Sequence, residues 1–212
     1  MKVMVRRKMP DFGGAKERAG EILNTLSEDY EFHNYDHTFS DVYPNAEKLA
    51  DMEKISGDKR LVLRTAVVYH DTGHTRKYRG HEEASVTIAQ EELPKFGYGD
   101  EQIERIGRVI DATRVYEDLK QRPGNEILRK IMCDSDLSNF GSDMFFVRTH
   151  QLMVELERLG MNWIEKGDVM GWLGSTYGFL KGHSYFTDSA RELWNEKKKD
   201  NMKQLERILK RG

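Results

Sequence analysis

VVYHDTGH, residues 67–74, places two histidines and one aspartate at the end of an apolar run. Leu63, Val67, His70 and His74 follow one another at steps of four, three and four, which is the spacing of one helical face. His70 is therefore expected to point into the core. A buried imidazole without a partner costs on the order of 1–3 kcal/mol, so a hydrogen bond to a backbone carbonyl is one interpretation of this histidine.

Asp71 favours a second interpretation, a bound metal ion. Adjacent helical residues point about 100° apart, so His70 and Asp71 can converge on one point only near a helix end. Thr72 and Gly73 indicate that the helix does end there. A single ion, reached by an imidazole nitrogen and a short carboxylate, explains both the adjacency of the two residues and the end of the helix.

Histidines gather in the first half of the chain, where five of the seven lie between positions 33 and 81. They are His33, His37, His70, His74 and His81. If the segment HNYDH at residues 33–37 is helical, its two histidines stack one turn apart on one face. The pattern therefore predicts a polar cluster built from more than one segment.

Two carboxylates lie downstream in ILRKIMCDSDLSN, residues 127–139. Asp134 and Asp136 each end an apolar stripe of helical spacing, and periodicity does not separate them. Buried carboxylates need compensating charge, which a bound cation supplies. A mixed shell of imidazole and carboxylate suits Mn, Fe, Zn or Ni better than Ca.

Helical periodicity dominates the whole chain, and no segment alternates as a strand does. We predict an irregular all-α bundle of about nine helices, forming one domain over residues 1–212. Pro44 is expected to kink or restart the second helix. The expected helices span residues 15–30, 36–55, 57–71, 81–93, 100–113, 122–137, 143–160, 168–182 and 187–210.

The amino-acid composition argues against several classes of function and location. Apolar residues make up 38% of the chain and charged residues 33%, with a net charge of -2, which is typical of a soluble protein. This balance gives no electrostatic basis for nucleic-acid binding, and no apolar run reaches the length of a membrane span. The basic start, MKVMVRRKMP, lacks the apolar core of a secretory signal. Cys133 is the only cysteine, so we expect no internal disulfide and a cytoplasmic location.

Three ordered motifs carry a family resemblance: HNYDH at 33–37, HDTGH at 70–74 and SDLSN at 135–139. They resemble the HD-domain superfamily of metal-dependent phosphohydrolases, in the form of a small bacterial HD protein whose motifs are similar to those of cyclic-nucleotide phosphodiesterases. The resemblance implies an all-α scaffold and a first metal ion, Mn, Fe, Zn or Ni. The resemblance also favours Asp136 over Asp134 as a metal ligand. The implied ligands of this ion are His37, His70, Asp71 and Asp136.

The same resemblance implies the remaining roles at the site. His33 protonates the leaving oxygen, His74 faces the substrate phosphate or a second ion, and Asp71 bridges to that second ion, Mg or Mn. His81 and Glu82 have an equal alternative as acidic and polar groups that offset a helix dipole, and Arg114 has the alternative of an exposed surface residue. The candidates for contacts with substrate or the second ion are Asn34, His81, Glu82 and Arg114.

The predicted function is hydrolysis of a phosphomonoester or phosphodiester of a nucleotide by metal-activated water. The expected partner is a small phosphorylated substrate, with no nucleic acid and no membrane, and the chain is expected to form a homodimer. Two other classes stay open. A di-iron oxygenase of the HD fold would need His74 and His81, with His150 or His183, on its second iron. A metal or ligand sensor would use the same site without catalysis.

Overall fold

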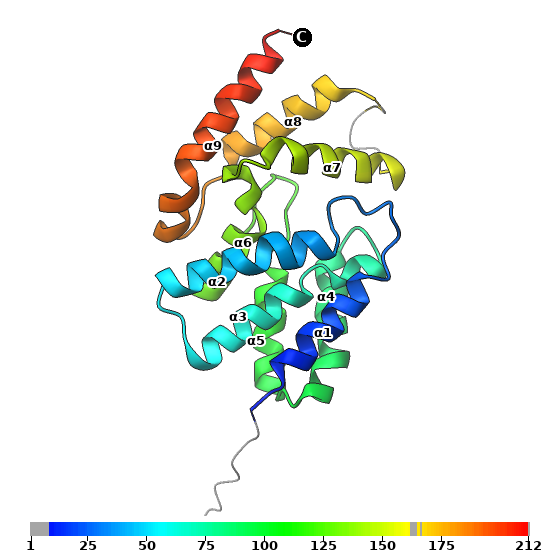
Figure 1. Cartoon of the computed structure of the whole chain (residues 1–212), viewed down its shortest axis with the longest axis vertical. Helices are drawn as coiled ribbons and strands as arrows, with labels where there is room; N and C mark the ends of the chain where they lie inside the picture. Colours follow the sequence, from blue (N-terminus) through cyan, green and yellow to red (C-terminus); the bar gives the residue numbers. More distant parts are fainter. Residues whose placement is uncertain (1–8, 162–164, 166, 212) are drawn as a thin grey trace, which may run out of the picture.

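The computed structural model describes residues 9–161, 165 and 167–211, and over these residues the fold is all-α (Figure 1). The expected fold class is confirmed, with nine α-helices and no strand in the described ranges. Short 3-10 turns cover Thr72–Thr75, Leu93–Phe96 and Ser138–Gly141, and a π-helical turn covers His37–Val42. The helices are α1 Phe12–Leu23, α2 Tyr43–Met52, α3 Gly57–Tyr69, α4 His81–Glu92, α5 Asp100–Asp111, α6 Ile127–Asp136, α7 Phe145–Arg158, α8 Val169–Gly182 and α9 Asp188–Leu209.

Helices α1 to α6 form the lower body of the molecule, and α7 to α9 lie across its upper end (Figure 1). The main core is built from side chains of α1 to α6. Tyr185, just before α9, and Ala190 and Trp194, in the first half of α9, also belong to it. A smaller cluster, made of Phe140, Phe145, Leu180 and Leu205, holds the upper helices together. The C-terminal helices are therefore packed onto the body through side chains of both clusters.

Helix α3 is the centre of the body, since α1, α2, α5 and α6 all pack against it. Almost every residue in its second half is buried, as expected for a helix that is apolar on all sides. Each fully buried Val or Leu side chain contributes roughly 1.5–3 kcal/mol of transfer free energy. This burial fixes the end of α3, and with it the direction in which His70 and Asp71 leave the helix.

The α-helix α2 begins at Tyr43, beside Pro44, where we expected a kink or a restart, and the helix changes type there without a break. The turn before it is π-helical, and the Tyr43 N–H donates to the carbonyl of Thr38, five residues back. Pro44 has no N–H to donate, and it lies in the first turn of α2, where no donor is required. The helical path is thus continuous from the π-helical turn into α2, and His37 at its beginning is only 2% exposed.

Further expectations concern membrane association, an N-terminal signal, domain organisation, location and assembly. None of the helices in the described part of the chain is long and apolar enough to cross a membrane. The basic N-terminal residues 1–8, for which we expect no secretory signal, lie outside the described residues. The single domain over residues 1–212, the cytoplasmic location and the homodimer stay predictions.

Candidate metal centre and active site

Four side chains from three segments meet at the upper end of α3: His37 from the π-helical turn, His70 and Asp71 beyond α3, and Asp136 at the end of α6. His70 Nε2 lies 3.1 Å from Asp71 Oδ2 and 3.5 Å from Asp136 Oδ1. His37 Nε2 lies 3.6 Å and 3.5 Å from the same two oxygens. Ligands bound about 2.0–2.2 Å from one ion lie roughly 2.8–3.6 Å from one another, so these four atoms fit around a divalent ion.

The hydrogen bonds of His70 support that fit. His70 Nδ1 bonds to the carbonyl oxygen of Val67 at 2.7 Å, so Nδ1 carries the proton and Nε2 is left with its lone pair in the neutral ring. Within the described residues, His37 Nε2, His70 Nε2 and Asp71 Oδ2 are buried without a hydrogen-bond partner. The carbonyl bond and the ion site are therefore compatible, because they use different nitrogens of one ring.

Electrostatics at this cluster favour a cation. Burial lowers the pKa of His70, but Asp71 and Asp136 outweigh it and raise that pKa well above the usual value. Burial raises the pKa of Asp136, yet His37 and His70 bring it down to about 2. A proton on His70 Nε2 thus balances the carboxylates when no ion is bound. Ion binding takes the place of that proton, so it should release protons to solvent.

The second oxygen of Asp71 faces a second group of histidines. Asp71 Oδ1 lies 3.6 Å from His81 Nε2 and 3.9 Å from His74 Nε2. The His74 ring stacks on His81 at 3.9 Å and on His33 at 4.4 Å between centroids. His33, Asp71 and His74 offer ligand atoms within 4.8 Å of one another. One carboxylate therefore lies between two groups of nitrogen atoms, the arrangement that a bridging ligand requires.

Gly73 allows this second group to form. The Gly73 N–H donates to Ser85 Oγ at 2.7 Å, and Ser85 Oγ donates to the carbonyl of His70 at 2.5 Å, which ties the end of α3 to α4. A Cβ atom on residue 73 would lie 1.9 Å from the carbonyl oxygen of His81. Only glycine permits α4 to come this close, and the close approach brings His81 beside His74.

Gly73→Ala is accordingly expected to lower the free energy of unfolding by about 1–3 kcal/mol, the usual cost of forcing extra atoms into a packed region. Gly178→Ala on α8 is the matched control, because nothing lies within 4 Å of a Cβ there. That change should be neutral or stabilise by roughly 0.5–1 kcal/mol through helix propensity. Urea unfolding followed by circular dichroism measures both, and equal stabilities for the two variants would contradict the close approach.

His33 is held by a residue from the upper helices. The helical segment begins only at Tyr35, so His33 and His37 are not stacked in one helix, and a loop positions His33 instead. Glu155 Oε2 accepts hydrogen bonds from the N–H groups of Phe32 and His33, both at 2.8 Å. Glu155 Oε1 lies 2.5 Å from His33 Nδ1 and also accepts from the Tyr78 hydroxyl at 3.0 Å. The Glu155 carboxylate, fully buried in α7, thus fixes the ring of His33.

The charge of His33 follows from the same contact. Burial lowers the pKa of His33, but the adjacent Glu155 carboxylate outweighs burial, and with Asp71 and Asp136 it raises this pKa to about 9. His33 therefore carries a proton on each nitrogen at neutral pH. Since Glu155 takes the proton on Nδ1, the proton on Nε2 is the one available to a ligand.

The remaining candidate residues are only partly brought to the site. The amide of Asn34 is engaged by the backbone of its own loop: it donates to the carbonyls of Tyr30 and Glu31 and accepts from the His37 N–H. That bonding builds the turn before the π-helical segment. The side chain of Asn34 is thus engaged by its own loop, and its contact with substrate or a second ion stays a prediction.

Glu82 and Arg114 lie at the edge of the second group. Glu82 is 7% exposed, and its Oε2 lies 3.8 Å from His81 Nδ1. Arg114 follows α5 and pairs with Asp111 at 2.9 Å. Burial lowers the pKa of Arg114, but Asp111, with a smaller contribution from Glu82, raises it. Glu82 is thus beside His81, and Arg114 is held by Asp111.

Asp134 and Asp136, which periodicity leaves undecided, face different parts of the molecule. Asp134 accepts hydrogen bonds from the N–H groups of Phe186 and Thr187 at 2.7 and 2.9 Å and from the Thr187 hydroxyl at 2.7 Å. Burial, partly offset by these bonds, raises the pKa of Asp134 to about 6. Asp134 therefore anchors the start of α9, whereas Asp136 faces the two histidines.

Glu155 and Gln121 also contact the site, and sequence reasoning missed both. Glu155 supports His33, and Gln121 donates from Nε2 to Asp136 Oδ2 at 3.0 Å. Glu155 did have a signal, because it lies on the buried face of α7 together with Phe145 and Leu156. Gln121 lies in an irregular loop, where periodicity gives no signal.

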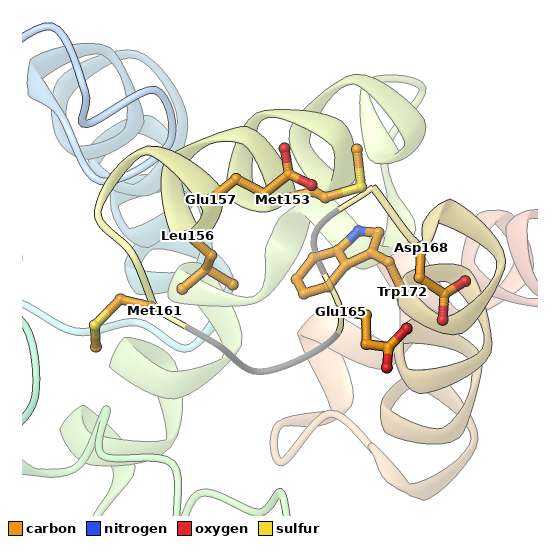
Figure 2. Close-up of a pocket in the computed structure, with 7 residues that line it drawn as sticks. All are labelled: Met153, Leu156, Glu157, Met161, Glu165, Asp168 and Trp172. Carbon is orange, nitrogen blue, oxygen red and sulfur yellow. The ribbon is translucent and has the colours of Figure 1, made fainter.

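A small hollow between α7 and α8 is separate from this site (Figure 2). Met153 and Leu156 of α7 line it together with Trp172 of α8, whose Nε1 donates to the carbonyl of Thr149 at 3.1 Å. None of the predicted site residues lines the hollow. It belongs to the packing of the upper helices.

Comparisons with known proteins agree with the fold. The family model of the HD domain matches residues 34–137. A predicted HD superfamily hydrolase from an uncultured Thermotogales bacterium has a crystal structure that matches 100% of this chain and 99% of its own, at 16% identity and a TM-score of 0.61. Bacillus subtilis YpgQ, solved in complex with ADP, matches 92% of this chain and 96% of its own, at 18% identity and a TM-score of 0.63. No protein of curated function matches the sequence.

The residues matched by the family model include the adjacent pair His70 and Asp71 and the distant Asp136. Their side chains converge at one end of an all-α body, and two solved structures share that fold along most of their length. The resemblance drawn from the three sequence motifs is thereby confirmed: this chain is an HD-domain protein.

Proposed function

We propose that the protein is a metal-dependent phosphohydrolase that cleaves a phosphomonoester or phosphodiester of a nucleotide. One observation carries the proposal. Ligand atoms of His37, His70, Asp71 and Asp136 lie at mutual distances that suit a divalent ion, and a protonated histidine, His33, lies on the other side of Asp71. A cation there would activate the attacking water, and the acid would protonate the leaving oxygen, which suits phosphoester hydrolysis.

An ion held by His37, His70, Asp71 and Asp136 would supply Lewis-acid activation of water and polarisation of the phosphoryl group. The other roles fall to side chains of the chain. Asp71 presents Oδ2 to the first group of ligands and Oδ1 to the second, so it links the two groups. His33 donates the Nε2 proton to the leaving oxygen, while Glu155 keeps the ring charged and oriented. His74, with no hydrogen bond to either ring nitrogen among the described residues, is left to bind phosphate or a second ion.

Support for a nucleotide substrate comes from the ADP bound to YpgQ, a protein of the same fold. This is an analogy of fold, and fold alone does not define substrate. A panel of nucleoside mono-, di- and triphosphates, cyclic nucleotides and non-nucleotide phosphoesters should be tested with Mn, Mg, Ni and Zn on metal-analysed protein. Turnover of at least one nucleotide, lost in His70→Ala, is the expected result. No turnover with any of these esters would favour a non-catalytic sensor instead.

Asp136→Asn and Asp134→Asn form a matched pair on α6. We expect Asp136→Asn to lose bound ion, because a neutral amide replaces a ligand oxygen that faces His37 and His70. Asp134→Asn should keep its ion but unfold at a lower temperature, because the amide cannot accept all three hydrogen bonds at the start of α9. Ion content by mass spectrometry and thermal melting separate the two effects. Equal ion loss in both variants would contradict the assignment of Asp136.

A second candidate is the di-iron oxygenase, favoured by the nitrogen-rich group at Asp71 Oδ1. His74 and His81 do lie beside that oxygen, as the oxygenase requires of its second iron. His150 is exposed on α7, and His183 is bonded to Lys198 near α9, so neither completes the group. Oxygen uptake by the iron-loaded protein, or a mixed-valent iron signal, would support this candidate over hydrolysis.

A further inference from the structure

Gln121 is a buried residue that directly follows an exposed run in a loop. The loop joins α5 to α6 over residues 112–126, and its residues 115–120 are all exposed. Gln121 is only 6% exposed, and Thr113 at the start of the loop is also buried. Gln121 is therefore a point at which the loop returns to the body.

The side-chain amide of Gln121 connects the beginning of its loop to Asp136. Its Nε2 donates one hydrogen bond to the carbonyl of Thr113, at the beginning of the same loop, and another to Asp136 Oδ2, both at 3.0 Å. Its Oε1 is buried and has no partner within the described residues. The two hydrogens of one amide thus close the loop and hold the carboxylate.

The bond to Asp136 uses the oxygen that does not face the histidines. Oδ1 lies 3.5 Å from both His37 Nε2 and His70 Nε2, whereas Oδ2 receives the Gln121 hydrogen bond. Without this bond the carboxylate could rotate about its Cβ–Cγ bond and withdraw Oδ1 from the cluster. Partners that orient metal ligands in this way typically change ion affinity by 10–100-fold when they are removed.

We propose that Gln121 is a positioning residue: it presents Asp136 Oδ1 to the ion and, through the same hydrogen bond, couples ion binding to closure of the loop 112–126. The inference rests on the proposed metal centre, but not on which substrate is hydrolysed. Linkage makes the coupling reciprocal. If closure of the loop strengthens ion binding by a given factor, the ion must favour the closed loop by the same factor.

The loop offers a direct measurement of its own closure. Lys120 is exposed and immediately precedes Gln121, so trypsin can cut the bond between them only when Gln121 leaves its buried position. Arg122 is followed by Pro123, which protects the next basic site from trypsin. The rate of cleavage after Lys120, with and without Mn²⁺, therefore reports opening of the loop at that residue.

Gln121→Met removes the amide at nearly constant size, and Gln102→Met is the matched control. Gln102 also donates an amide hydrogen to a carboxylate, Asp58 Oδ1 at 2.7 Å, but it lies at the start of α5 on the surface. The dissociation constant for Mn²⁺ is measured from the electron paramagnetic resonance signal of the free ion. We expect Gln121→Met to raise it 10–100-fold and Gln102→Met to leave it within about twofold. Gln121→Leu, which also lacks both donors and adds no charge, should resemble Gln121→Met and replaces it if the helical circular dichroism of that variant is lost.

In the wild type, saturating Mn²⁺ should slow cleavage after Lys120 by about the same factor, and in Gln121→Met it should not. An unchanged Mn²⁺ dissociation constant in both Gln121 variants would overturn the positioning role. Equal cleavage of the wild type with and without Mn²⁺ would overturn the coupling. Failure of the wild type itself to bind Mn²⁺ would overturn the proposed metal centre and this inference together, and the wild-type titration alone reveals it.

Discussion

Asp71→Ala is expected to remove the bound ion and to reduce phosphoester hydrolysis to the uncatalysed level. Asp71 is the residue whose two oxygens face both groups of histidines, with Oδ2 at 3.1 Å from His70 Nε2 and Oδ1 at 3.6 Å from His81 Nε2. Its loss should therefore cost more than the roughly 10–100-fold that follows removal of an outer partner. Ion content by mass spectrometry and turnover of the best nucleotide substrate measure the two effects.

His33→Ala is the companion variant for this experiment. His33 belongs to the group with Asp71 and His74, and it is not part of the group formed by His37, His70 and Asp136. We expect it to retain ion at the wild-type ratio while losing rate. The interpretation would be wrong if Asp71→Ala retained the wild-type ion content, because the bridging carboxylate would then have no part in holding the ion.

Glu155→Gln is expected to lower kcat by roughly 10²–10⁴-fold, the usual contribution of a positioned acid, while ion content stays unchanged. The carboxylate of Glu155 accepts from His33 Nδ1 and from two backbone N–H groups, and a neutral amide cannot accept from all of these donors. His33 then loses both its orientation and the charge that favours its protonated form. Steady-state kinetics and ion analysis on the same preparation separate this effect from loss of ion.

The pH dependence of the same variant gives a second measurement. Against the opposing effect of burial, Glu155 raises the pKa of His33 from 6.5 to about 9. The contact therefore stabilises the folded protein fully below pH 6.5, and this stabilisation is lost as pH rises through 9. Because the acid must carry its proton, the rate should fall on the basic side, and this fall should begin at lower pH in Glu155→Gln than in the wild type.

Glu157→Gln serves as the control for Glu155→Gln, since it lies on the same helix and its carboxylate accepts from the Gly167 N–H instead. It should change neither kcat nor the basic limb. A Glu155→Gln enzyme with the wild-type rate and pH profile would exclude a role for His33 as the acid held by Glu155.

The sequence predicts much of this molecule because its signals are local and periodic. Apolar residues at helical spacing predict the nine helices, and the buried stripe ending at His70 predicts which way that histidine points. The geometry brings His37, His70, Asp71 and Asp136 to one place, as the motif resemblance implies. Their roles as ligands stay predictions until ion content is measured.

The parts that sequence reasoning missed are contacts between segments far apart in the chain. Glu155 lies 122 residues after His33, and Gln121 reaches Asp136 from an irregular loop. The contacts of Asn34 were missed for the opposite reason, because they are local: backbone groups of its own loop bond to its amide. Spacing could not show whether Asp134 or Asp136 faces the histidines, since both are spaced to point inward. The hydrogen bond from the Thr187 N–H to Asp134 shows that Asp134 contacts the start of α9 instead.

The π-helical turn at His37–Val42 has a consequence for how the chain can change in length. Such a turn holds one more residue than an α-helical turn, and π-turns often occur at functional positions. Deleting one residue between positions 38 and 42 would allow a regular α-helix to run into α2 with its packing intact. Because an α-helical turn needs one residue fewer, His37 before the deletion and the buried residues of α2 after it would keep their directions. Loss of one codon here should therefore leave His37 facing Asp71 and Asp136, whereas the same loss inside α2 would rotate His37 by about 100° relative to the rest of that helix.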